Sequence, residues 1–98
     1  MKYDIRGKNI EVTETISEKV KKQLNKLDKY NVIDEDATAK VVVKVYPKEK
    51  QTIKVSIPVK NDTLVAEASA ENLYDAIDEV GEKLRRQVKR THMYKMAQ

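Results

Sequence analysis

The chain contains no cysteine, tryptophan or phenylalanine among its 98 residues. The absence of cysteine excludes disulfides and thiolate metal sites, and it is typical of proteins that work in a reducing compartment. No apolar run approaches the roughly 20 residues that a membrane-spanning helix needs. We therefore expect a cytoplasmic protein that has no membrane partner.

Glycine and proline are scarce, with two of each, and aromatic residues make up only 5% of the chain. So few breakers allow long regular segments, and apolar residues recur in those segments with a clear period, which is not typical of disorder. A chain of this length can build one modest core. Because we find no repeat or linker, we predict one domain over residues 1–98, with an ordered core over roughly 1–91 and a polar tail over 92–98.

Two segments show the spacing of amphipathic helices. The first begins after Thr13, a plausible N-cap, and runs to roughly Tyr30. The second covers residues 71–95, after the expected cap Ser69. The apolar positions are Ile16, Val20, Leu24 and Leu27 in the first segment, and Leu73, Ile77, Val80, Leu84 and Val88 in the second. Each segment therefore presents one apolar stripe to a core.

Four segments alternate apolar and polar residues as half-buried strands do. They cover about residues 2–6, 40–46, 53–60 and 63–68. Pro58 has no N–H, so we expect it at an edge or a bulge of the sheet. The order of elements is β-α-β-β-β-α. A crossover makes the first two strands parallel, and the remaining strands form an antiparallel meander.

We therefore predict an α+β fold, in which two helices pack on one face of a four-stranded mixed sheet. The predicted core consists of Ile16, Val20, Leu24, Leu27, Val41, Val43, Val45, Val55, Ile57, Leu73, Ile77, Val80 and Leu84. The predicted strand over residues 63–68 contains the small residues Ala66 and Ala68, which allow a helix to approach closely. Gly81, in the middle of the second helix, costs about 1 kcal/mol relative to Ala. We expect it to mark a close approach of the two helices.

Charge is divided along the second helix. The acids Glu71, Asp75, Asp78, Glu79 and Glu82 come first, and the bases Lys83, Arg85, Arg86, Lys89, Arg90 and Lys95 follow. An acidic start and a basic end suit the helix dipole. The dipole does not require so many bases, and the net charge of the chain is +4. The surplus indicates a polyanionic partner.

Bases also gather on one flank of each helix, at about 100° per residue. The flank of the first helix carries Lys19, Lys22, Lys26 and Lys29, and the same-handed flank of the second carries Lys83, Arg86, Lys89 and Arg90. Arg85 points to the opposite flank. Ordinary solvated helix faces are the alternative explanation. Because two helices share the bias, we favour a surface that follows phosphates.

The other polar residues form no recognisable catalytic or metal site. His92 lies past the last clear core position, and residues 34–36 lack the spacing of a calcium loop. Tyr74 lies beside the apolar stripe, where partial core packing competes with stacking on a base. There is no glycine-rich phosphate loop and no nucleophile–base pair. We predict no enzymatic activity, no metal, no cofactor and no small-molecule substrate.

Several segments, in this order and spacing, match a known pattern: Ile5–Thr13, Lys26–Tyr30, residues 66–68 followed by 73–78, and Lys83–Gln87. Together they resemble the bacterial ribosome hibernation promoting factor family, which includes protein Y, over almost the whole chain. The resemblance implies a β-α-β-β-β-α domain similar in outline to double-stranded RNA-binding domains. It also implies binding to the small ribosomal subunit and its ribosomal RNA, in the decoding region where messenger and transfer RNA would lie.

The family's basic positions fall on Lys26, Lys83, Arg86 and Arg90. With the helix flanks, the predicted RNA-binding set becomes Lys22, Lys26, Lys29, Lys83, Arg86, Lys89 and Arg90. Two positions depart from the pattern: Gln23 stands where the family usually has Lys, and His92 falls in a tail that is usually Lys-rich. Long members of the family add a C-terminal dimerisation domain, so we expect dimerisation only of a longer form.

The leading hypothesis is a non-enzymatic translation inhibitor that acts by occupying the ribosome. A general double-stranded RNA-binding module is the main alternative, since it would use the same cationic helices on isolated duplexes. A protein-interaction domain would instead use the open face of the sheet, where Val42 and Tyr46 lie. The lysines of that face, Lys40, Lys44, Lys54 and Lys60, make this alternative less favourable.

Overall fold

The structure is a computed structural model that describes the backbone of residues 1–97 and the side chains of residues 1–90. Its elements are β1 (Lys2–Lys8), α1 (Glu14–Asn25), the short 3-10 helix η1 (Asp28–Tyr30), β2 (Thr38–Lys44), β3 (Gln51–Val59), β4 (Asp62–Ala70) and α2 (Leu73–Ala97). The predicted order β-α-β-β-β-α is confirmed.

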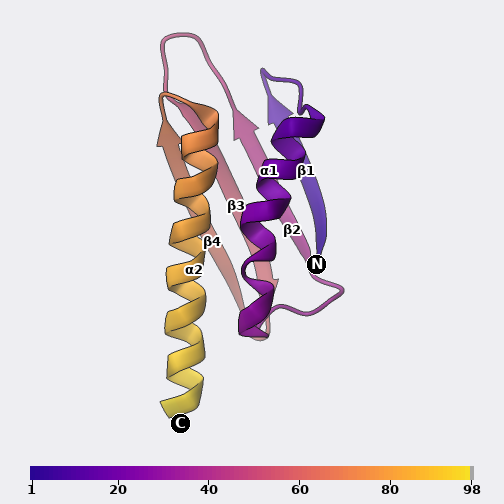
Figure 1. The fold of residues 1–98 in the computed structure, drawn as a ribbon, viewed down its shortest axis with the longest axis vertical. Helices are drawn as coiled ribbons and strands as arrows, with labels where there is room; N and C mark the ends of the chain where they lie inside the picture. The colour runs from indigo at the N-terminus through magenta and orange to yellow at the C-terminus, as the bar shows by residue number, and fades with distance from the viewer. Residues whose placement is uncertain (98) are drawn as a thin grey trace.

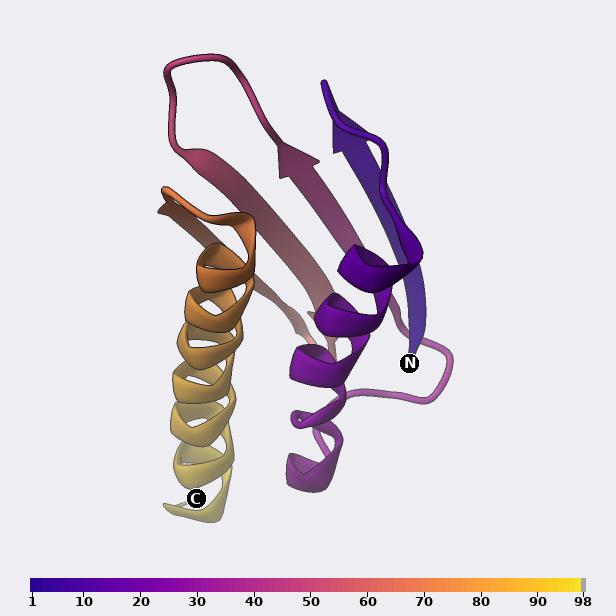
Figure 2. The ribbon, with the colours of Figure 1, turned by 45° about the horizontal axis from the view of Figure 1, so that its top comes forward.

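The four strands form one sheet in the order β1-β2-β3-β4. β1 pairs with β2 in parallel, and the pairs β2–β3 and β3–β4 are antiparallel. Both helices lie on the same face of the sheet and run in the same direction (Figure 1). Figure 2 shows α2 over β3 and β4, with α1 beside it on the β1–β2 side. The other face of the sheet is left without a covering layer.

The core lies between the sheet and the two helices. Val43 on β2 and Val80 on α2 are fully buried, with 0% and 1% of their surface exposed, so the predicted register of strand and helix is confirmed. Val45 is the exception among the predicted core residues. It is only half-buried because β2 ends at Lys44. Ala66 and Ala68 are buried beneath α2, as their small size predicted.

The start of each helix follows from a capping side chain. Thr13 caps α1, because its hydroxyl accepts a hydrogen bond of 3.2 Å from the backbone N–H of Ile16. The prediction of Ser69 as the cap of α2 is wrong. Pairing of β4 with β3 continues to Ala70, which keeps Ser69 in the strand, where its hydroxyl lies 2.9 Å from that of Thr52. Asn72 takes the capping role, since its side chain accepts from the N–H of Tyr74 at 2.8 Å.

Pro58 lies neither on an edge strand nor in a bulge, so that prediction is also wrong. β3 is an interior strand, and its register with β4 runs unbroken past Pro58. The pairing of β2 with β3 ends at Lys40 and Ser56, two residues before Pro58. A missing N–H that points toward β2 therefore leaves no ladder hydrogen bond unmade.

α2 continues through residues 92–97, where the sequence suggested a polar tail after the core. The side chains there, including that of His92, lie outside the described residues. None of the helices in the described part of the chain is both long and apolar enough to cross a membrane.

Tyr3 connects β1 to α1. Its hydroxyl donates a hydrogen bond to the side-chain oxygen of Asn25, and the Lys21 ammonium lies 5.7 Å from the centre of its ring. Burial of the phenol, with a smaller contribution from the carboxylate of Asp28, raises the pKa of Tyr3 to about 12. The folded protein therefore disfavours the ionised form of this side chain.

We predict that Tyr3 makes folding less favourable at high pH. Above about pH 10 the phenol ionises in the unfolded chain, whereas in the folded protein it keeps its proton until about pH 12. The folded state binds more protons in this range, so the free energy of unfolding falls as the pH rises. Urea denaturation at pH 9 and pH 11 should show a larger loss for the parent than for Tyr3→Phe. Equal losses of unfolding free energy in the two proteins would contradict a raised pKa of Tyr3 as the cause.

Candidate nucleic-acid interface

Three predicted bases of the first helical segment point to solvent. Lys22 is on α1, Lys26 is its C-cap residue, and Lys29 is in η1; all three are exposed. Lys29 also lies 5.2 Å from the centre of the Tyr30 ring. Lys19 differs from them, because its ammonium makes an ion pair with Asp78 of α2 at 2.9 Å.

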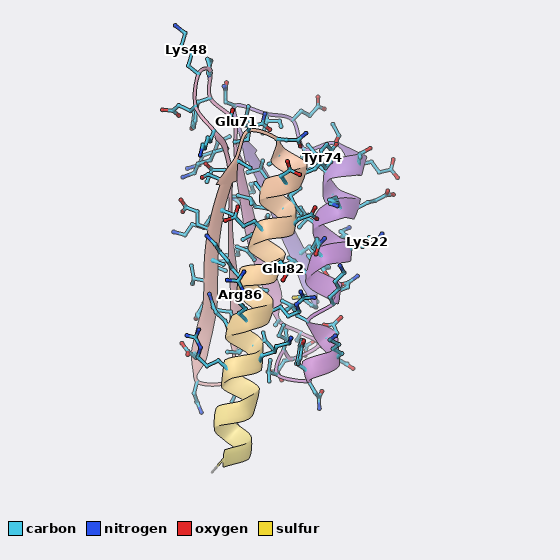
Figure 3. All side chains as sticks on the ribbon, turned by 60° about the vertical axis from the view of Figure 1, so that its left-hand side comes forward. Lys22, Lys48, Glu71, Tyr74, Glu82 and Arg86 are labelled. Atoms are coloured by element: carbon cyan, nitrogen blue, oxygen red, sulfur yellow. The ribbon has the colours of Figure 1, made fainter. Side chains whose placement is uncertain are left out.

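The predicted bases of α2 divide into two groups. Arg86, Lys89 and Arg90 are exposed, and Figure 3 shows Arg86 on the β4 side of α2 and Lys22 on the far side of the helix layer. Lys83 turns to the edge of β4. Its ammonium donates to the backbone carbonyl of Glu67 at 2.8 Å and lies 3.7 Å from the carboxylate of Glu79.

The relative direction of the helices decides where the basic flanks point. Because α1 and α2 run the same way, flanks of the same hand face the same way: that of α1 faces α2, and that of α2 faces the edge of β4 (Figure 1). Arg85, predicted on the opposite flank of α2, therefore lies on the side of α1, one turn beyond Gly81. It makes an ion pair with Glu82. Sequence spacing could not show this proximity to α1, because it contains no information about which flank has a neighbour.

Gly81 is the point where α2 approaches α1. A Cβ atom on it would lie 3.0 Å from Oε1 and 3.3 Å from Cβ of Gln23. The side-chain amide of Gln23 donates to Asp78 at 2.6 Å. The predicted close approach of the helices is confirmed. Gln23, which stands where the family usually has Lys, contacts α2 in this protein.

The exposed bases of the helix layer are electrostatically uncompensated. Within the described side chains of residues 1–90, no carboxylate lies within ion-pair distance of Lys22, Lys26, Lys29, Arg86, Lys89 or Arg90. We name these six residues the free basic set. Arg presents a planar fork that matches phosphate oxygens, and Lys acts as a mobile point charge. Such a group of cations attracts a phosphate backbone.

The other face of the sheet carries a different mixture. Lys44 and Lys54 lie there, opposite the buried Val43 and Ile53, and Lys54 is paired in register with Glu67 of β4. Both lysines are separated from the free basic set by the core. They can serve as charge-matched controls for it.

The remaining candidates do not form a site. Residues 34–36 are exposed in a loop, and no group of three potential metal ligands occurs among the described residues. Tyr74 keeps 39% of its surface exposed at the start of α2, so its ring packs on the core only in part. Neither observation indicates a bound ion or cofactor.

Fold and charges together define the class: a small α+β domain whose two parallel helices carry the free basic set. The model of the family described as Sigma 54 modulation protein / S30EA ribosomal protein matches residues 3–95. The chain belongs to this family, and the resemblance seen in the sequence is confirmed.

The relatives are ribosome hibernation promotion factors. The chain is 42% identical over 90 residues to the ribosome hibernation promotion factor of Lactococcus lactis subsp. cremoris (strain MG1363). This match covers 92% of this chain and 49% of the relative. It is 37% identical over 90 residues to that of Bacillus subtilis (strain 168), covering 92% and 48%. This chain thus spans about half the length of the curated relatives it matches.

Solved structures confirm the fold. The N-terminal domain of Thermus thermophilus protein Y is 33% identical, with a TM-score of 0.82, and the match covers 93% of this chain and 99% of that one. A ribosomal subunit interface protein from Coxiella burnetii is 17% identical with a TM-score of 0.77, over 93% and 97% of the two chains. At that identity the second likeness shows the fold alone.

We predict that a large side chain at position 81 forces the helices apart. Gly81→Leu should lower the free energy of unfolding by about 1–3 kcal/mol, the usual cost of overpacking. Combining it with Gln23→Ala should recover part of this loss, because the smaller side chain leaves room. Urea denaturation of the parent, both single variants and the double variant measures the coupling. If Leu at position 81 costs the same with Gln or Ala at position 23, the contact does not limit the spacing.

Proposed function

We propose that this chain is a ribosome-binding hibernation domain. It binds the decoding region of the small ribosomal subunit, contacts ribosomal RNA, and excludes messenger and transfer RNA. Membership of the family and relatives named as ribosome hibernation promotion factors support the ribosome as partner. The observation that carries the proposal to RNA is the free basic set, six exposed cations of the helix layer that have no carboxylate within ion-pair distance among the described side chains of residues 1–90.

The proposed mechanism is occupancy. The folded chain measures 47 × 22 × 19 Å, so it is an elongated body. A folded body of this size inhibits by filling a space that RNA must enter, and its cations hold it there through phosphates. No bond is made or broken in this mechanism, so it requires neither a catalytic residue nor a cofactor. Its place of action is the cytoplasm, where ribosomes are.

The bases have separate proposed roles. Arg86 and Arg90 each offer a forked contact to phosphate or to a guanine edge. Lys22, Lys26, Lys29 and Lys89 add mobile charges around them. Lys83 belongs to the predicted RNA-binding set, but it must release Glu67 or Glu79 before it reaches a phosphate. We therefore expect it to contribute less than the two arginines.

A general double-stranded RNA-binding module is the second candidate. The β-α-β-β-β-α order and the cationic helices favour it, because such modules recognise duplexes through shape and phosphates. Sedimentation with purified ribosomal subunits, with free duplex RNA as competitor, separates the two functions. A ribosome-specific domain stays on the small subunit in the presence of excess duplex, and a general module is displaced. The proposed role of residues 1–98 requires no second copy of the chain.

We predict that ribosome binding weakens steeply with salt. Each phosphate contact releases condensed counterions, so a protein with 6–10 phosphate contacts loses about 10³–10⁵ in affinity between 50 and 200 mM salt. Cosedimentation with small subunits at increasing potassium chloride measures the slope. Retention that does not depend on ionic strength would contradict a phosphate-based interface.

We predict that Arg86→Ala with Arg90→Ala abolishes most ribosome binding without unfolding the protein, since both side chains are exposed. Charge-assisted contacts are worth about 1.5–3 kcal/mol each when well formed. Affinity for small subunits and inhibition of translation in vitro measure the effect, and circular dichroism checks the fold.

The matched control is Lys44→Ala with Lys54→Ala, which removes the same charge from the open face of the sheet. This variant should keep most of the affinity. If it lost binding while the arginine variant kept it, the RNA-facing surface would lie on the sheet.

A further inference from the structure

α1 repeats the charge order of α2. Glu14 and Glu18 lie in its amino-terminal part, and Lys22, Lys26 and Lys29 follow. In α2, Asp75 and the acids after it again precede the bases. Each helix, taken alone, only suits its own dipole.

The packing of the helices places these charges side by side. The contacts Lys19–Asp78 and Gln23–Gly81 align α1 with α2 level by level. Both helices run in the same direction (Figure 1), so the acidic halves neighbour each other and the basic halves neighbour each other. Figure 3 shows the order along α2, from Glu71 at its start to Arg86 in its basic half. The helix layer is therefore mostly acidic at one end and mostly basic at the other, with Asp28 as an exposed acid at the basic end.

Ion pairs occur at the boundary between the two ends. They are Lys19–Asp78, Lys83–Glu79 and Arg85–Glu82. They neutralise the bases closest to the acidic half. Lys22 lies level with this boundary, next to Gln23, which packs on Gly81, and the other five members of the free basic set lie beyond it. Before the boundary, Glu18 and Asp75 are exposed carboxylates with no base within ion-pair distance among the side chains of residues 1–90.

We propose that RNA contacts the helix layer only across the carboxyl-terminal halves of α1 and α2, and that the acidic halves exclude duplexes from lying along the helices. α2 has 25 residues, or roughly 37 Å at 1.5 Å per residue. A duplex laid along it would bring phosphates against Glu18 and Asp75, and such like-charge contacts suppress wrong partners. A phosphate backbone that crosses both helices at their basic ends meets the free basic set, with Asp28 of η1 as an exposed carboxylate among these cations. The proposed exclusion of duplexes rests on the proposed function, which supplies the ribosome as the correct partner.

The test compares two variants of equal charge. Glu18→Gln with Asp75→Asn neutralises the acidic half of the helix layer. Glu49→Gln with Glu67→Gln is the control: Glu49 lies in the β2–β3 loop, and the Glu67 side chain lies on the open face of the sheet, although its backbone carbonyl accepts from Lys83. Each pair removes two negative charges, so the net charge rises from +4 to +6 in both. Circular dichroism confirms that both variants fold.

The probe is a blunt RNA duplex long enough to lie along α2, titrated at low salt and followed by fluorescence anisotropy. We expect the helix-layer variant to bind it about threefold or more tightly than the parent, since counterion release increases with each phosphate that can be reached. The control should gain less than half as much. Affinity of the helix-layer variant for small ribosomal subunits should stay unchanged, because the acidic half does not contact RNA there.

Equal gains in both variants would mean that net charge alone sets duplex affinity, and would overturn the proposal. So would an absence of gain in the helix-layer variant, or duplexes that none of the proteins binds. Failure of the parent to bind ribosomes would overturn the proposed function instead, and the duplex comparison would still decide the charge effect.

Discussion

The sheet has only one apolar face, and the rest of the structure depends on this constraint. Val41, Val43 and Val55 are fully buried on that face, and lysines such as Lys54 occupy the other. Both helices must therefore cover the same face, side by side. Their closeness is set at Gly81, where the absence of a side chain leaves room for Gln23. This arrangement decides that one flank of α1 faces α2 and one flank of α2 faces the edge of β4.

The polar contacts of α2 have two different tasks. Toward α1, Asp78 joins Lys19 and Gln23 and holds the helices in register. Toward β4, Lys83 and Gln87 donate to backbone carbonyls of the edge strand at 2.8 Å. An edge strand with free carbonyls invites pairing with another chain, so these side chains also protect the sheet. The bases beyond these contacts stay available to an external partner.

The proposed mechanism, inhibition by occupancy, makes particular demands on a small domain. The body has to be rigid, since a flexible chain would lose conformational entropy on entering a confined site. Its cations have to project from a fixed frame, which regular helices on a sheet provide. Under this proposal, salt and single surface charges change the affinity for RNA, while the core can stay unchanged.

Sequence periodicity was enough for the fold. The 3.6-residue spacing of Ile16 to Leu27 and the alternation around Val43 and Val55 predicted element types, order and core, because burial on one face leaves a direct trace in the residue pattern. Periodicity did not predict which residue caps α2. Ser69 and Asn72 are equally good caps by residue type, and only the pairing of β4 with β3 decides between them. The sequence identified the basic residues and the helices that carry them, but it did not show which residues surround each base. Only the tertiary structure shows that Arg85 lies on the side of α1, that Lys83 turns to β4, and that the acidic half of one helix neighbours the acidic half of the other. These neighbourhoods result from the packing of two parallel helices at Gly81. The sequence of one helix holds no information about its distance from another helix, because packing sets that distance.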